Sequence, residues 1–242
     1  MSALAGIVVT PVATIEARRL DEPWDWARDN RALVEAYWKE LSRDNPAYFN
    51  GRVLVRRRQS LEGGRLSLDY VETDYASFIA FRDHGFPDPT SGNGFAMAAL
   101  KSADGAYLLG RMADHTSNAG KLYFPAGTPD PQDVLPYGSV DLAGSVLREL
   151  AEETGLTTDD VEVTDRWTAV FAGARTAMMR DLRVPTSAEA TRGRVRAFIA
   201  REDKPELCDL CIVREPADID PGAMPPFMQA FLREAFAREG QR

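Results

Sequence analysis

Cysteine and histidine are scarce in this sequence of 242 residues, which contains only two of each. The cysteines form a single C-x-x-C, Cys208 and Cys211, and no second pair of ligands accompanies them, so neither a zinc site nor a redox pair is expected. The surrounding run is strand-like, which would place residues three apart on opposite faces. This use of cysteine fits a reduced, cytoplasmic protein.

Long apolar runs and an excess of basic residues are also missing. No segment approaches the roughly 18 apolar residues that cross a bilayer, and no basic residues precede the first apolar run as they would in a signal peptide. The formal net charge is −8, whereas binding a phosphate backbone usually needs a basic face. Neither a membrane nor a nucleic acid is therefore an expected partner. An acidic protein can still bind a small anionic substrate if metal ions lie between them.

Strand and helix patterns alternate along the chain, and their character changes near the turn-rich loop at 87–94. We predict an N-terminal α+β extension over 1–92 and a second domain over 93–242. Neighbouring strands that look like hairpins, together with flanking helices, indicate a mixed sheet of the α+β or α/β class. Strands are predicted over 7–15, 51–59, 64–73, 94–102, 105–112, 121–127, 166–174, 176–184 and 209–214. Helices are predicted over 24–44, 74–85, 140–155, 187–202 and 224–239.

The segment RELAEETGL, residues 148–156, contains three glutamates. Glu149, Glu152 and Glu153 are spaced i, i+3 and i+4, so a helix would bring them onto one face with Cβ atoms roughly 5–6 Å apart. Such a cluster is most often a solvated helix face. It is also a suitable support for a divalent cation, because carboxylate oxygens suit Mg²⁺, Mn²⁺ and Ca²⁺.

The context of these glutamates decides between the two interpretations. The segment resembles the second half of the Nudix box, R-E-U-x-E-E-x-G-U, where U is a bulky aliphatic residue. All seven defined positions match: Arg148, Glu149, Leu150, Glu152, Glu153, Gly155 and Leu156. The sequence is identified as a member of the Nudix hydrolase family over roughly 93–240. The resemblance implies an α/β/α sandwich and a metal-dependent hydrolase that cleaves a nucleoside diphosphate linked to another moiety.

The first half of the box departs from the family pattern. Val140 and Val134 stand where a glutamate and a glycine are expected, and the glycine expected after the entry strand is Gly127, the last residue of FPAG (124–127), seven positions early. The loop before the helix therefore carries an insertion of about seven residues. Asp141 is expected either to replace the missing glutamate or to serve only the N-terminus of the helix.

The resemblance also implies roles for the glutamates. Glu149 and Glu153 are expected to be the first ligands of Mg²⁺ or Mn²⁺, with Glu152 a ligand directly or through water. Arg148 is expected to hold Glu149 by a bidentate ion pair. Glu206, in the loop before the last strand, is expected to complete the metal site, and the general base is either Glu206 or a glutamate of the box.

Two further positions are expected to contact the substrate, Arg111 at the end of a strand and Gly127 in the FPAG turn. The arginines of the helix at 187–202 could also contact phosphates, although a solvated basic face is the commoner explanation. A homodimer is expected, because the N-terminal strands need partners and the family often dimerises.

The substrate is less specified by the sequence. Gly120, Phe124, Pro125 and Gly127 match the G-x3-F-P-x-G part of the coenzyme A-type signature, but the arginine expected in the middle of that signature is absent. The N-terminal plan, with FNGRVLV and DYASF, resembles the UDP-sugar diphosphatase branch. We expect a nucleotide sugar. Coenzyme A and ADP-ribose are alternatives, as is a non-catalytic role in which the domain binds a nucleotide as a regulator.

Overall fold

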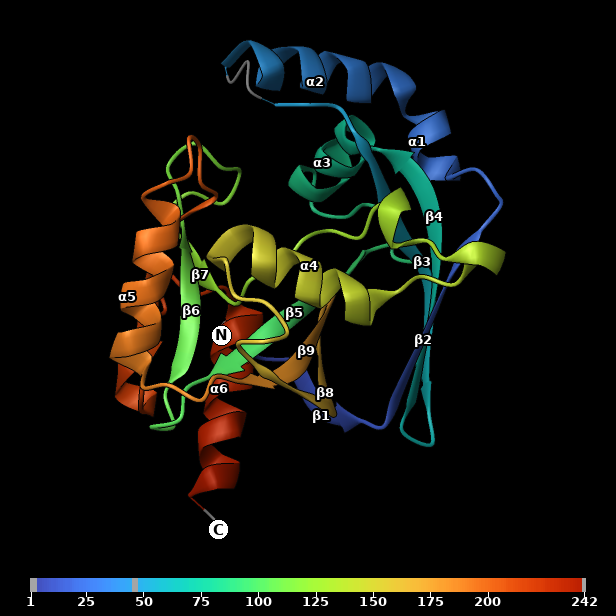
Figure 1. Ribbon diagram of the computed structural model, residues 1–242. Coiled ribbons are helices and arrows are strands. Elements are labelled where there is room, and N and C mark those ends of the chain that lie inside the picture. Colours follow the sequence, from blue (N-terminus) through green and yellow to red (C-terminus); the bar gives the residue numbers. More distant parts are fainter. Residues whose placement is uncertain (1–3, 45–47, 241–242) are drawn as a thin grey trace.

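The computed structural model describes residues 4–44 and 48–240, and its centre is a seven-stranded sheet, sheet A (Figure 1). The strands lie in the order β1-β8-β9-β5-β6-β10, and the short β7 pairs with β6. β5 and β9 are parallel, whereas the other pairs are antiparallel, which confirms the predicted mixed sheet. The strands are β1 (Val8–Val12), β5 (Asn93–Lys101), β6 (Tyr107–Met112), β7 (Leu122–Tyr123), β8 (Glu162–Ala172), β9 (Arg175–Arg183) and β10 (Leu207–Val213).

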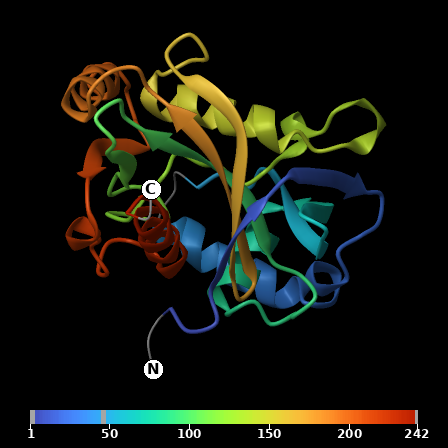
Figure 2. The same ribbon diagram turned by 90° about the horizontal axis from the view of Figure 1, so that it is seen from below.

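Helices cover both faces of sheet A. α4 (Leu142–Thr154) and α5 (Ala188–Ile199) share one apolar core, whereas α6 (Pro226–Glu239) belongs to the core on the other face. Figure 2 shows α4 and α6 on opposite sides of the strands. The α/β/α sandwich is therefore confirmed. In the described part of the chain, no helix is both long and apolar enough to cross a membrane.

The N-terminal region builds a second sheet, sheet B, with the strand order β2-β4-β3. It comprises β2 (Thr14–Leu20), β3 (Arg52–Glu62) and β4 (Arg65–Asp74), together with α1 (Asp25–Asp29), α2 (Arg31–Asp44) and α3 (Tyr75–Asp83). Val53 and Val55 of β3 pack against α3, whereas Leu54 points the other way, into the core that contains α4. Alternation along β3 thus lets one strand serve both the helices of this region and the sandwich.

Three sequence predictions differ from the structure. The strand predicted over 7–15 is two strands, because the chain leaves sheet A after Val12 and enters sheet B at Thr14. The helix predicted over 24–44 is interrupted at Asn30, whose side-chain amide donates to the Trp26 carbonyl. The strand predicted over 121–127 forms ladder pairs only at β7. The domain boundary at residue 92 stays a prediction. β1 comes before this boundary in the sequence, but it pairs with β8 in sheet A of the sandwich.

Candidate active site

The sequence of helix α4 explains where the helix begins, where it ends and which face it buries. The Oδ1 atom of Asp141 accepts a hydrogen bond from the Gly144 N–H at 2.8 Å, which caps the helix N-terminus. The helix ends at Gly155, whose φ of +69° is the left-handed conformation that glycine adopts without strain. Val146 and Leu150 are fully buried and hold the inner face on sheet A. Of the two roles considered for Asp141, the structure shows the capping role.

Glu153 is the most unusual residue of this helix. It is only 5% exposed, and within residues 4–44 and 48–240 neither of its carboxylate oxygens has a well-formed hydrogen bond. Its pKa is raised well above the ordinary value, first by burial and then by the negative charges of Glu206 and Glu149, while the backbone N–H of Ala126 opposes the shift. Enclosing a carboxylate without a partner costs several kcal/mol unless a cation or a proton balances its charge.

Glu149 lies one turn before Glu153 and is also largely enclosed, with its side chain 13% exposed. Burial raises its pKa to about 7, helped by neighbouring carboxylates and opposed by Arg148. A Cβ atom at position 127 would collide with the Glu149 carboxylate. The structure therefore places Gly127 at the site, where the missing side chain leaves room for Glu149.

Arg148 does not form the bidentate pair with Glu149 that was predicted. Its Nη1 contacts Glu149 Oε1 at 2.8 Å and Glu152 Oε2 at 3.2 Å. Its Nη2 instead donates to both carboxylate oxygens of Asp133, at 3.1 and 3.3 Å. The sequence interpretation missed Asp133, which ends a short 3-10 turn at Pro131–Asp133 inside the inserted loop. The available signal was the D-x-x-D capping pattern formed with Asp130.

Glu206 joins the two enclosed glutamates from a different part of the chain. Its backbone carbonyl accepts from the Ala113 N–H at 2.8 Å, which fixes the loop before β10 to the end of β6. The charge of its side chain contributes to the raised pKa of both Glu149 and Glu153. Glu152, by contrast, is 59% exposed and lies on the outer side of the helix.

The structure thus gathers Glu149, Glu153 and Glu206. They are not a preassembled ligand set: the described residues contain no group of three acidic, histidine or cysteine side chains that could hold an ion. An all-oxygen donor set in which two carboxylates, Glu149 and Glu153, are enclosed nevertheless fits a hard divalent cation such as Mg²⁺ or Mn²⁺.

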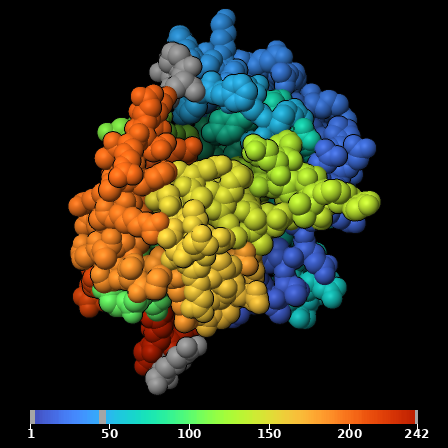
Figure 3. All heavy atoms as spheres, viewed as in Figure 1, coloured from blue at the N-terminus to red at the C-terminus, as the bar shows by residue number. Residues whose placement is uncertain are grey.

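A recess in the surface lies beside α4 (Figure 3). Figure 3 shows it where α4 (yellow) meets the orange segment before β10 and the teal helix α3. Tyr123, at the end of β7, belongs to this neighbourhood: burial is the main cause of its raised pKa, and the charges of Glu153, Glu206 and Arg82 also act on it. Arg82 is part of α3, so a charge of the N-terminal region acts on this neighbourhood.

Arg111 is not brought to the glutamates. It lies on the same face of β6 as Tyr107 and Leu109, whose side chains belong to the core on the α6 side of the sheet. Its charge acts instead on Cys211, on the neighbouring strand β10. Substrate contact by Arg111 stays a prediction that this placement does not support.

The arginines of α5 are occupied elsewhere. Arg192 and Arg196 both pair with Asp209, at 2.6 and 2.7 Å, and Arg194 pairs with Asp160 at 2.5 Å. These ion pairs account for the basic face of α5 without a phosphate ligand.

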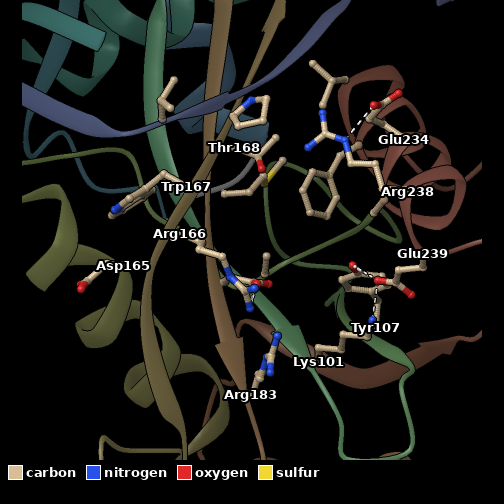
Figure 4. Close-up of a pocket in the computed structure, with 18 of the residues that line it drawn as sticks. Lys101, Tyr107, Asp165, Arg166, Trp167, Thr168, Arg183, Glu234, Arg238 and Glu239 are labelled. Atoms are coloured by element: carbon tan, nitrogen blue, oxygen red, sulfur yellow. Dashed lines mark hydrogen bonds and ion pairs between the residues drawn. The ribbon is translucent and has the colours of Figure 1, made fainter. Parts of the chain in front are cut away.

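A cavity of about 500 Å³ lies on the other side of sheet A, between α6 and strands β1, β8 and β9 (Figure 4). Ion pairs between its lining residues join Lys101 to Glu239, Arg166 to Asp181 and Arg238 to Glu234. No residue of α4 lines it. The cavity is therefore separate from the acidic site and already balanced in charge along much of its wall.

The fold and the acidic helix define a class, a hydrolase built on an α/β/α sandwich with clustered glutamates. Residues 92–235 match the sequence model of the NUDIX domain, which is more than half of the chain. The chain belongs to the Nudix hydrolase family, whose members generally use divalent metal ions. A comparison with curated proteins finds no match.

Solved structures of the family resemble this fold only distantly. A Nudix hydrolase from M. smegmatis, RenU, has 18% identity and a TM-score of 0.37, covering 61% of this chain and 86% of its own. An Ap4A hydrolase from C. elegans has 13% identity and a TM-score of 0.42, covering 61% and 99%. A MutT protein from Methanosarcina mazei Go1 has 20% identity and a TM-score of 0.38, covering 62% and 96%. At these values the family assignment rests on the sequence match.

Proposed function

We propose that this protein uses Mg²⁺ or Mn²⁺ to hydrolyse a phosphoanhydride bond in a nucleoside diphosphate linked to another moiety. The observation that carries the proposal is the enclosed carboxylate of Glu153, which has no well-formed hydrogen bond and no cationic partner among the described residues, while the charges of two further glutamates act on it. Such an arrangement destabilises the metal-free fold and is balanced when a cation binds. Glu149, Glu153 and Glu206 would hold that cation.

The chain's own residues have separate tasks in this reaction. When bound, a divalent cation supplies positive charge that offsets the diphosphate and lowers the pKa of water. Arg148 holds Glu149 from one side, so that the carboxylate stays turned toward the site. Glu206 is the solvent-exposed member of the three glutamates, and we therefore assign to it the removal of a proton from the attacking water.

The substrate is a nucleotide sugar in this proposal. The recess beside α4 is bordered by α3, so the N-terminal region, whose sequence resembles the UDP-sugar diphosphatase branch, contributes to the space that a substrate would enter. Coenzyme A and ADP-ribose remain the competing substrates, and only measured turnover separates them.

The test is a turnover screen on the full chain with Mn²⁺ or Mg²⁺. The panel contains UDP-glucose, ADP-ribose, coenzyme A and a diadenosine polyphosphate, and the products are separated by anion exchange. In ¹⁸O-water, one phosphate of each product pair is expected to carry the label, because water is the nucleophile. Glu153→Gln is expected to remove turnover, whereas Glu189→Gln, an exposed glutamate on α5, is the matched control. Turnover of no panel member with either metal contradicts the proposal.

A further inference from the structure

The inserted loop that precedes α4 is tied to the N-terminal sheet at both of its ends. At its start, the Pro129 carbonyl accepts from the Leu54 N–H of β3 at 2.7 Å. At its end, the Val140 N–H donates to the Ala17 carbonyl of β2 at 2.8 Å. Sheet B therefore holds the loop in place as a fixed part of the fold.

Asp133 lies in the middle of this loop and is buried, with only 5% of its surface exposed. Its carboxylate accepts from the Asp130 N–H at 3.1 Å, from the Ser145 hydroxyl at 3.3 Å and from Arg148 through both oxygens. Its own carbonyl accepts from the Asp141 N–H at 2.7 Å, next to the start of α4. A buried carboxylate with this many donors has a fixed orientation.

Arg148 is consequently divided between two groups of acids. Nη2 is held by Asp133, which leaves Nη1 to make single contacts with Glu149 and Glu152. A guanidinium released from Asp133 would be free to turn both nitrogens toward Glu149, since fork-to-carboxylate pairing is its preferred geometry. That pairing would occupy oxygens that a cation needs.

We propose that Asp133 is a positioning residue of the metal site: it restrains Arg148 so that the Glu149 carboxylate stays available to a divalent cation. The proposal rests on the proposed function, because it assigns a purpose to the inserted loop within that same site. It also gives the N-terminal sheet a role in the reaction, since β2 and β3 fix the loop that presents Asp133.

The test is titration of the full chain with Mn²⁺ alone, following free Mn²⁺ by electron paramagnetic resonance. Asp133→Asn keeps the shape and removes the charge, and we expect the Kd for Mn²⁺ to rise about tenfold, as for loss of a group that orients a ligand. Asp133→Glu restores the charge and is expected to recover part of the affinity. Asp130→Asn, in the same turn but without contact to Arg148, is the matched control and should stay within about twofold.

Turnover supplies a second readout that a purely structural role would not move. In Asp133→Asn the Mn²⁺ concentration for half-maximal rate should rise about tenfold, while kcat at saturating Mn²⁺ stays within about threefold of wild type. If Asp133→Asn does not fold, Arg148→Lys tests the same link, because one ammonium group cannot replace a fork that spans Asp133 and Glu149, and the Kd for Mn²⁺ should again rise.

The outcomes separate this inference from the proposed function. Unchanged Mn²⁺ affinity in a folded Asp133→Asn, together with lost affinity in Glu153→Gln, overturns the role of Asp133 and leaves the metal site intact. Wild-type protein that binds Mn²⁺ no better than Glu153→Gln overturns both. For the Arg148→Lys variant, wild-type affinity for Mn²⁺ likewise counts against Asp133.

Discussion

Two carboxylate clusters of this protein contrast sharply although both involve arginine. On the outer side of β10, a single carboxylate, Asp209, receives Arg192 and Arg196 at 2.6 and 2.7 Å. At α4, Arg148 faces several carboxylates at once, and Glu153 has neither an ion pair nor a well-formed hydrogen bond in the described segments. The first cluster has more positive than negative charge, and the second has the reverse.

The pKa shifts of the two clusters have opposite signs for this reason. Burial alone would raise the pKa of Asp209, but hydrogen bonds from Arg196 and Arg192 hold it well below its ordinary range. Burial raises the pKa of both Glu149 and Glu153, and like charges add to it. A cluster that its own chain satisfies contributes to stability, whereas one left unbalanced indicates a charge that must come from outside.

The largest effect is expected from Glu153→Gln, which removes the unbalanced charge and leaves the shape. Turnover should fall by ~10³-fold or more, because the amide cannot neutralise a cation. Steady-state assays at several Mn²⁺ concentrations measure this loss. The metal-free variant should melt no lower than wild type, since an unfavourable charge has been removed. A rate within tenfold of wild type would place the metal ligands elsewhere.

Gly127→Ala is expected to disturb the same cluster through space alone. The new Cβ atom would meet the carboxylate of Glu149, which must turn away from its present position. We expect Mn²⁺ affinity and kcat/KM to fall about 10- to 100-fold, as when a ligand loses its orientation. Gly193→Ala on α5, where nothing lies within 4 Å of the new atom, is the control and should leave both unchanged. Unaltered Mn²⁺ binding in Gly127→Ala would show that Glu149 tolerates the displacement.

Glu149→Gln should sharpen the contrast through pH. The folded state raises the pKa of Glu149 to about 7. The protonated Glu149 side chain therefore contributes to the stability of the fold below about pH 4, and this contribution is lost as the pH rises through 7. In EDTA at pH 8 the variant should therefore gain about 2 kcal/mol in unfolding free energy over wild type, and nothing at pH 4. Urea denaturation at both pH values measures this. A less stable variant at pH 8 would mean that the contact with Arg148 outweighs burial.

The helix and its glutamates were predictable from sequence, and their partners were not. RELAEETGL is a local pattern, and the periodicity that makes it helical also brings Glu149 and Glu153 together. Asp133 contacts Arg148 from fifteen residues away, and that contact depends on how β2 and β3 hold the loop. The D-x-x-D pattern marks the turn that contains Asp133, but no local pattern indicates that its carboxylate contacts Arg148.

Strand faces explain the other differences. Side chains alternate between the two faces of β6, so the sequence predicts that Arg111 and Leu109 lie on the same face of sheet A. The sequence does not indicate which face of the sheet α4 will cover. The break at Ala13 between β1 and β2 is similarly invisible, because both halves have strand propensity and only the two sheets assign them different partners. Fold class follows from local pattern, whereas the assembly of the site follows from packing between distant segments.

The smallest effect is expected from Asp209→Asn, which tests the satisfied cluster. Because the folded state lowers the pKa of Asp209, its contribution to stability is present above about pH 4 and is lost as the pH falls further. The variant should lose about 1 kcal/mol at pH 7, and the difference from wild type should shrink toward pH 2. Mn²⁺ affinity and kcat should stay within about twofold of wild type, because Asp209 is bound by α5 and does not face the glutamates of α4. Urea denaturation across this pH range measures the first effect. If Asp209→Asn were more stable than wild type at pH 7, it would behave as we expect Glu149→Gln to behave at pH 8. The two clusters would then not differ in the sign of their charge balance.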